Sequence, residues 1–197
     1  MANKNALWKI AKDGIKAPSL ITGSSRGTHG MVKQILLLNS AIYGGYLLMS
    51  GPMGVQYKRF FTLDGSSSIT SLPLCHFSHT SALQFAVNFG ALYTVGHWHA
   101  KTFGCMHMTK VAGVSAALAT VLGVHHVYKN NEQTIAGSNA MSAGLITYNI
   151  FKNPQWFTLL RIHPMIWMAA LTAYAGFGND KAAVGGIAGG YLAFLFL

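Results

Sequence analysis

Long apolar runs separated by short polar stretches dominate this sequence of 197 residues. A helix needs roughly 20 mostly apolar residues to cross the hydrocarbon core of a bilayer. Six segments reach or approach that length, and they cover residues 34–55, 81–99, 106–127, 135–151, 156–177 and 182–197. The pattern therefore predicts an all-α, polytopic membrane protein built as a bundle of six transmembrane helices.

Two of these segments are short for a span, namely 135–151 and 182–197. A helix at the centre of a bundle can be shorter than one that faces lipid, because its ends need not reach the headgroups. Lys110 and Arg161 lie near the beginnings of their segments, where a long side chain can extend to the membrane surface. Neither feature therefore argues against six spans.

The composition supports membrane insertion. Hydrophobic residues make up 51% of the chain and charged residues 9%, whereas a soluble domain carries about a quarter charged residues. The acidic residues all lie between the apolar runs, at Asp13, Asp64, Glu132 and Asp180. The net charge of +10 is spread over loops and the N-terminus instead of one face, so it indicates membrane orientation and not nucleic-acid binding.

The basic residues also predict the orientation, because Lys and Arg near the membrane concentrate on the inner side. With six spans, both termini lie on one side. That side carries Lys4, Lys9, Lys12, Lys16, Arg26, Lys33, Lys101, Lys110 and Lys152. The other side carries Lys58, Arg59, Lys129 and Lys181, and Asp64, Glu132 and Asp180 partly offset them. We therefore expect the N-terminus to face the cytoplasm or the mitochondrial matrix.

The chain divides into a basic N-terminal segment, residues 1–33, and a membrane domain, residues 34–197. Apolar residues alternate with lysines in the first segment, which is typical of a helix lying on a membrane surface. Its lack of acids also fits a mitochondrial presequence, and a basic tail that only sets the topology fits equally well. The longest loop, residues 56–80, holds several aromatic residues and is expected to lie in the membrane interface.

Three polar residues stand at the beginning of the second apolar segment: His79, Gln84 and Asn88. Gln84 and Asn88 are four residues apart and share one face of a helix. Ser78 or Thr80 is expected to cap that helix. The two carboxamides fit either an oxyanion site or hydrogen bonds between helices, and bonds between helices are the commoner use inside bundles.

Small residues mark two further segments. Ser142 lies among them in the fourth segment, which on its own is ordinary helix packing. In the last segment, "AAVGGIAGG" contains two overlapping pairs of glycines spaced by four, Gly185 with Gly189 and Gly186 with Gly190. This spacing predicts close contact with neighbouring helices.

Taken in order, these three pieces resemble the rhomboid intramembrane serine proteases, and their mitochondrial branch in particular. "FSHTSALQFAVNFGALYTVG" is similar to the family's second core span, with His79 in the leading His position. Gln84 then stands at the family's second His position, and Asn88 at the Asn position that stabilises the oxyanion. "AMSAG" matches the GxSG motif at the nucleophile, Ser142, and "AAVGG" matches the AHLGG-type motif with Ala183 at the position of the catalytic His.

The departures from the family pattern imply a protein that no longer cuts. A serine hydroxyl needs an adjacent base to take its proton, and Ala183 cannot do so. Alanines at 140 and 143 replace the glycines that flank the nucleophile in the family. Loss of one member of a serine–histidine unit costs on the order of 10⁴ to 10⁶ in rate. His163, in the fifth segment, is a conceivable substitute base, but it is expected near the side of the membrane away from Ser142.

The resemblance implies a rhomboid-like pseudoprotease without a cofactor, in the mitochondrial inner membrane, with its N-terminus in the matrix. Such a protein works by binding transmembrane helices of other subunits and lipids. We expect an accessory subunit of a respiratory-chain complex or of ATP synthase. The alternatives are a preprotein translocase component and a residual serine protease that uses Ser142.

Histidines and cysteines add one more alternative. Bis-histidine haem or metal ligation is possible in principle, but most histidines lie at span ends, where solvation tolerates them. These are His97, His99, His107, His125 and His126. Cys75 and Cys105 are expected near opposite membrane surfaces, so no disulfide is expected between them.

Overall fold

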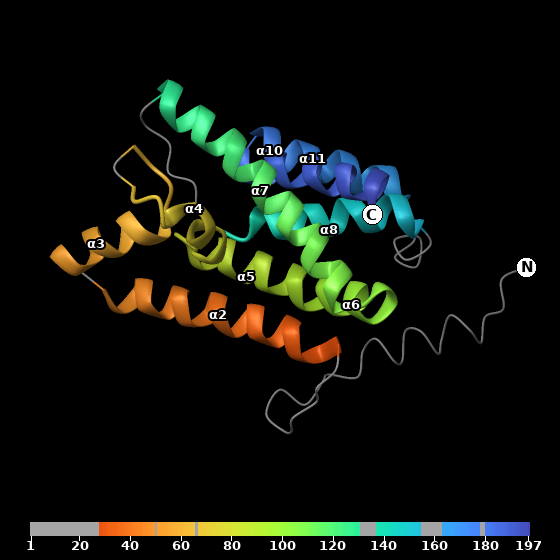
Figure 1. Cartoon of the computed structure of the whole chain (residues 1–197), viewed down its shortest axis with the longest axis horizontal. Coiled ribbons are helices and arrows are strands. Elements are labelled where there is room, and N and C mark those ends of the chain that lie inside the picture. The colour runs from red at the N-terminus through yellow and green to blue at the C-terminus, as the bar shows by residue number, and fades with distance from the viewer. Residues whose placement is uncertain (1–27, 50, 66, 131–136, 155–162, 178–179) are drawn as a thin grey trace, which may run out of the picture.

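The computed structural model describes residues 28–49, 51–65, 67–130, 137–154, 163–177 and 180–197, and all regular secondary structure in these ranges is helical (Figure 1). This confirms the all-α prediction. The α-helices are α2 (Thr28–Leu48), α3 (Gly51–Phe61), α4 (Ser71–Leu74), α5 (Ala82–Ala91), α6 (His97–Phe103), α7 (Cys105–Asn130), α8 (Asn139–Lys152), α10 (Pro164–Phe177) and α11 (Lys181–Phe196). A 3₁₀ turn, η1 (Cys75–Phe77), precedes α5, and a π-helical turn, η2 (Leu92–Gly96), joins α5 to α6.

The first predicted span, 34–55, is wrong at both ends. Helix α2 begins at Thr28 and ends at Leu48, and α3 begins at Gly51. Gly51 has φ +59°, a left-handed conformation that glycine adopts without steric cost, and Pro52 follows it in the first turn of α3. The predicted domain boundary at residue 33 therefore falls inside α2, and residues 1–27 lie outside the described part of the chain.

The second segment is one continuous helical path through α5, η2 and α6, which ends at Gly104 with φ +91°. The third predicted segment corresponds to α7. By length and composition, residues Cys105–Val127 of α7 form the one described helix able to cross a bilayer. The shorter apolar helices are Pro164–Ala175 and Lys181–Phe196. Arg161 lies outside the described residues.

Helix α11 lies against α7 and α8 (Figure 1), and its glycines allow the close approach. Gly185 and Gly189 face α7. A Cβ atom at Gly185 would overlap the backbone of Ala119, and one at Gly189 would overlap the backbone of Ser115. Only a residue without a side chain fits at these two positions.

The second glycine pair faces α8. A Cβ atom at Gly186 would overlap the backbone of Ala140, and one at Gly190 would overlap that of Gly144. The prediction that both glycine pairs make close helix contacts is thus confirmed. Because these contacts fix α11 against α8, they also fix the first turn of α11 relative to Ser142.

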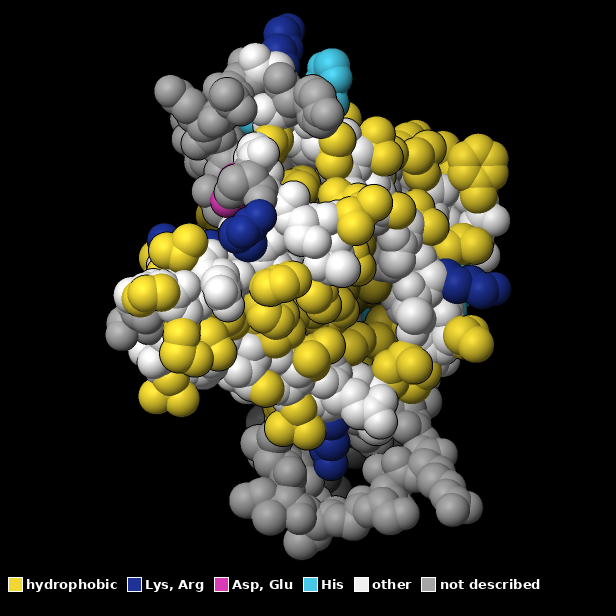
Figure 2. All heavy atoms as spheres, turned by 60° about the vertical axis from the view of Figure 1, so that its left-hand side comes forward, with side chains coloured by type: hydrophobic (Ala, Val, Ile, Leu, Met, Phe, Trp, Pro, Cys, Tyr) yellow, Lys and Arg dark blue, Asp and Glu magenta, His cyan; other side chains and the backbone are white. Residues whose placement is uncertain are grey.

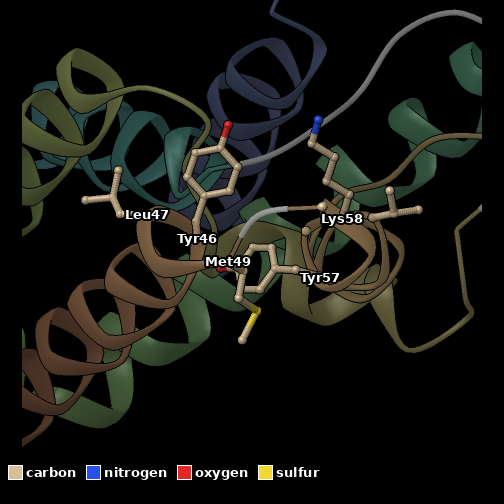
Figure 3. Close-up of a pocket in the computed structure, with 8 residues that line it drawn as sticks. Tyr46, Leu47, Met49, Tyr57 and Lys58 are labelled. Atoms are coloured by element: carbon tan, nitrogen blue, oxygen red, sulfur yellow. The ribbon is translucent and has the colours of Figure 1, made fainter.

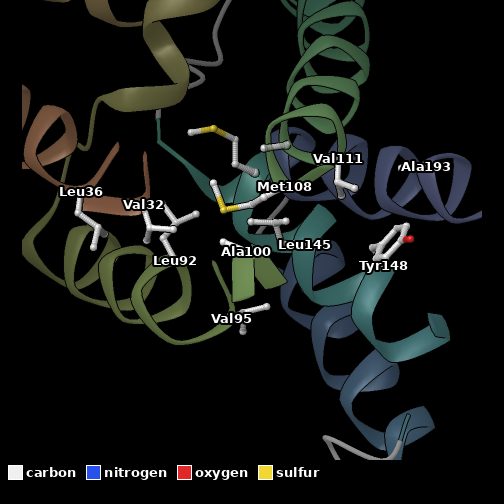
Figure 4. Packing of buried hydrophobic residues seen from close by; sticks show 12 residues of the cluster. Val32, Leu36, Leu92, Val95, Ala100, Met108, Val111, Leu145, Tyr148 and Ala193 are labelled. Carbon is white, nitrogen blue, oxygen red and sulfur yellow. The ribbon is translucent and has the colours of Figure 1, made fainter. Parts of the chain in front are cut away.

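An apolar core joins α2, the α5–α6 path, α7, α8 and α11 (Figure 4). Its members include Val32, Leu36, Leu92, Val95, Ala100, Met108, Val111, Leu145, Tyr148 and Ala193. Tyr148 is 1% exposed and lies near the end of α8. The core therefore surrounds α8, which is buried along most of its length.

Large apolar side chains are also exposed over several helices, and Figure 2 shows them covering much of one face. Leu37 and Leu48 of α2, Leu83 of α5, Val121 of α7 and Phe196 of α11 are all more than half exposed. Soluble monomers rarely expose apolar surface on this scale. Such a surface is typical of helices that face lipid or partner helices.

Candidate functional site

The start of α5 is capped by Ser81, and not by Ser78 or Thr80 as predicted. The Ser81 hydroxyl accepts a hydrogen bond from the backbone N–H of Gln84 (3.1 Å), and Gln84 Oε1 accepts one from the backbone N–H of Thr80 (3.1 Å). This reciprocal arrangement resembles a capping box, with Gln84 in the position of the third helical residue. The Ser78 hydroxyl instead donates to the carbonyl of Phe61. Part of the role of Gln84 is therefore to begin the helix.

His79 is buried and turned toward α2. Its Nε2 lies 3.0 Å from Oδ1 of Asn39, and the rings of Tyr43 and Phe85 meet its imidazole edge-on. Asn39 is 1% exposed, so this bond satisfies a polar group inside the bundle. His79 therefore holds the beginning of α5 against α2.

Asn88 belongs to a chain of polar groups that joins α5, α8 and α11. Its amide N–H donates to the backbone carbonyl of Gln84 (2.9 Å) and to Oδ1 of Asn139, the first residue of α8. Asn139 in turn donates to Oδ2 of Asp180, and Oδ1 of Asp180 accepts from the backbone N–H of Ala183 (3.0 Å). We call Asn88, Asn139 and Asp180 the amide–carboxylate chain.

Gln84 also faces the beginning of α8. Gly137 has φ +111°, and a Cβ atom there would overlap the Gln84 carboxamide. The backbone N–H of Gly137 donates to the carbonyl of Cys75 (2.7 Å). Gln84 and Asn88 thus share a helix face, as predicted, and that face covers the entry into α8.

Ser142 lies one turn into α8 and is 6% exposed. Its hydroxyl has no hydrogen-bond partner among the described residues. Ala183, at the position expected for a base, is 1% exposed and presents only a methyl group in the first turn of α11. His163 is exposed, and its Nδ1 accepts from the backbone N–H of Met165 (3.3 Å).

Four of the five predicted positions therefore gather around the beginnings of α8 and α11. Gln84 and Asn88 lie against the start of α8, Ser142 follows within α8, and Ala183 is tied to Asp180. His79 is the exception, because it faces α2. The arrangement supplies amide donors and a buried hydroxyl. It supplies no described group next to that hydroxyl that could take its proton.

A second polar cluster, near the end of α8, was not predicted. His99 Nε2 lies 3.0 Å from His107 Nδ1, and His107 Nε2 lies 3.2 Å from the hydroxyl of Tyr148. On its other side, His99 Nδ1 lies 3.2 Å from Oδ1 of Asn149, whose amide N–H donates to the carbonyl of Leu145 (2.7 Å). We call His99, His107, Tyr148 and Asn149 the histidine cluster.

The histidine cluster joins α6, α7 and α8. His99 and Asn149 are fully buried, and every ring nitrogen of the two histidines has a partner within the cluster. The two imidazoles, with ring centroids 5.2 Å apart, are stacked. The sequence shows polar residues inside apolar segments here, but their pairing depends on the turn at Gly104 that reverses the chain between α6 and α7.

No family model matches the sequence, and no curated protein matches it. Within the described ranges, no three His, Cys, Asp or Glu side chains lie together in the manner of metal ligands. Cys75 and Cys105 do not form a disulfide with each other. The function is therefore inferred from the geometry of the two polar clusters and the helices that hold them.

Proposed function

We propose that this chain is a catalytically inactive, rhomboid-like membrane protein with six spans. In this proposal it serves as a structural or accessory subunit of a large complex in the mitochondrial inner membrane, a respiratory-chain complex or ATP synthase. The observation that carries the proposal is the isolated hydroxyl of Ser142. It is buried beside no described base, and Ala183 occupies the position where the resemblance expects one.

The polar residues around Ser142 favour a structural role. An oxyanion site needs donors that point at a reacting atom. The amide of Asn88 instead donates to Asn139, and Asn139 donates to Asp180. These donors are occupied in joining α5, α8 and α11. Polar groups whose hydrogen-bond partners lie inside the bundle stabilise the fold. A protein without catalytic activity can still act by binding other proteins.

The exposed apolar surface supports a role in binding. Leu83 and Val87 of α5 and Met165 and Ile166 of α10 are each more than half exposed. In a membrane, these side chains would contact lipid or transmembrane helices of other subunits. The basic, acid-poor N-terminal segment favours a matrix-facing N-terminus.

A fluorophosphonate probe tests the loss of catalysis. We expect the full-length chain in mild detergent to show no labelling that depends on Ser142, because a serine without a base stays protonated and unreactive. The Ser142→Ala variant is the matched control, and an active serine hydrolase in the same detergent shows that the probe works. Labelling that Ser142→Ala abolishes would contradict the proposal and support a residual protease.

A native gel of mitochondrial membranes solubilised in mild detergent tests the role as a subunit. Mass spectrometry of the bands locates this chain. We expect it to migrate with a respiratory-chain or ATP-synthase assembly. Migration with a preprotein translocase would replace the proposed partner, and migration as a free monomer would contradict the role as a subunit.

A further inference from the structure

A pocket of about 400 Å³ lies between the end of α2 and α3, and no residue of either polar cluster lines it. Its lining residues include the apolar Leu47, Met49 and Val55. They also include Tyr46, Tyr57 and Lys58, and of these Tyr46 and Lys58 end in a hydroxyl and an ammonium that bond to no described residue. In Figure 3 these two groups point the same way, whereas Met49 points in the opposite direction. The pocket is therefore lined by polar groups that point one way and by apolar side chains, Leu47, Met49 and Val55, which form its apolar part.

The pocket has a firm wall. Tyr57 is 6% exposed, and its hydroxyl donates to the carbonyl of Ile42 in α2. Its ring stacks on Phe61 with centroids 4.5 Å apart and meets Tyr46 at 5.9 Å. These contacts join α3 to α2 and hold this wall of the pocket in place.

The surroundings of the pocket are those of a membrane interface. Helix α3 exposes Met53, Val55 and Phe60 next to the basic pair Lys58 and Arg59. A short helix that exposes large apolar and basic side chains together is typical of a segment lying among lipid headgroups. Figure 1 shows α3 at the end of the bundle where α2 ends, and headgroups would lie there in the proposed six-span arrangement.

We propose that this pocket binds one anionic glycerophospholipid. Lys58 and the Tyr46 hydroxyl would donate to the headgroup phosphate, since such charge-assisted bonds favour a phosphate diester. Leu47, Met49 and Val55 would contact the first part of an acyl chain. These apolar side chains favour a lipid over free phosphate, because free phosphate would leave them uncovered. A volume of about 400 Å³ suits a headgroup with its glycerol and a short length of chain.

The proposal rests on the membrane location within the proposed function, and not on the loss of catalysis. Extraction of membranes with alkaline carbonate separates the two. Release of the chain into the soluble fraction would contradict the proposed membrane location. A chain that stays in the membrane but shows no lipid preference would overturn the lipid site alone.

Native mass spectrometry of the purified full-length chain in detergent micelles tests the site. Phosphatidylglycerol and phosphatidylcholine with the same acyl chains are titrated separately. We expect one molecule of phosphatidylglycerol to bind about tenfold more tightly than phosphatidylcholine, because the choline cation would be repelled by Lys58 and the neighbouring Arg59. Lys58→Gln should weaken phosphatidylglycerol binding by about tenfold, as expected for one charge-assisted contact.

Two further variants complete the test. Lys129→Gln removes an exposed lysine at the end of α7, on the same predicted side of the membrane and outside the pocket, and should leave binding unchanged. Val55→Trp places a ring in the apolar part while keeping both polar groups, and should weaken binding of both lipids. Equal binding by Lys58→Gln and wild type, equal loss in Lys129→Gln, or displacement of the lipid by inorganic phosphate at the same concentration would overturn the proposal.

Discussion

Both polar clusters include residues of α8, but they join α8 to different helices. The amide–carboxylate chain uses Asn139, at the start of α8, and joins α8 to α5 and α11. The histidine cluster uses Tyr148 and Asn149, near the end of α8, and joins it to α6 and α7. The first includes Asn88, which the rhomboid resemblance assigns to the oxyanion site, and the second has no counterpart in the motifs. In both clusters the polar side chains form hydrogen bonds between helices. This indicates that their role is to hold the helices of the bundle together.

The largest expected loss of stability comes from disrupting the glycine contacts between α11 and α8, which bring Asn139 close to Asp180. Gly186→Ala should destabilise the chain by roughly 2 kcal/mol, because the added methyl group overlaps the backbone of Ala140 and forces α11 away from α8. Thermal unfolding in detergent measures this. Gly113→Ala in α7 is the control, since a Cβ atom there meets nothing within 4 Å, and it should be neutral or stabilising by up to about 1 kcal/mol. Equal melting temperatures for the two variants would contradict the close packing.

Asn139→Leu should have the next largest effect, about 1 to 2 kcal/mol, because it leaves the Asp180 carboxylate and the Asn88 amide each without one partner. Asn88→Leu should cost less, about 1 kcal/mol, because it removes a single bond between helices. The two changes together should cost less than their sum, since they break the same bond. Strict additivity in a double-mutant cycle would show that Asn88 and Asn139 are not coupled.

His99→Phe tests the histidine cluster. The ring is kept, but Asn149 and His107 lose their shared partner, so we expect a loss of about 1 kcal/mol. Combined with Asn139→Leu, the effects should add, because ten residues of helix separate the clusters by roughly 15 Å. A clear departure from additivity would mean that the two clusters respond as one unit, and the distinction between them would fail.

The smallest expected effect concerns the reactivity of the two cysteines. Cys75 lies near the entry to α8, and Cys105 lies two residues before His107 of the histidine cluster. Cys75 is buried beside the entry to α8, and burial raises the pKa of its thiol to about 12. Since the thiolate is the reactive form, this thiol stays protonated and unreactive at pH 8. Iodoacetamide should modify the partly exposed Cys105 in the folded chain and Cys75 only after unfolding, as peptide mass spectrometry would show. Equal rates at both positions would mean that the region around Cys75 opens readily.

The sequence predicted those parts of the fold that depend on local pattern. Helix α7, the glycine contacts of α11 and the shared face of Gln84 and Asn88 follow from hydrophobic runs and spacing of four. The break between α2 and α3 was missed, although Gly51 followed by Pro52 within the apolar run is a signal for it.

The partners of the polar residues could not be predicted. Asn139 and Asp180 are separated by 41 residues, and the bond between them exists only because α8 and α11 pack closely. His99 and His107 are separated by eight residues, and they meet because the chain turns at Gly104. Periodicity within a helix carries no information on such contacts, which depend on how the helices are placed.

A native gel that compares three forms of the chain tests the central claim most directly: wild type, Ser142→Ala and Asn139→Leu, each expressed in mitochondria that lack the native chain. If the polar residues around Ser142 serve assembly, Ser142→Ala enters the large complex of the proposed function as well as wild type does, because the Ser142 hydroxyl bonds to no described residue. Asn139→Leu enters in smaller amounts, because it loosens α5 and α11. A wild-type chain that migrates as a monomer, or a complex that forms only when Ser142 is present, would contradict the account.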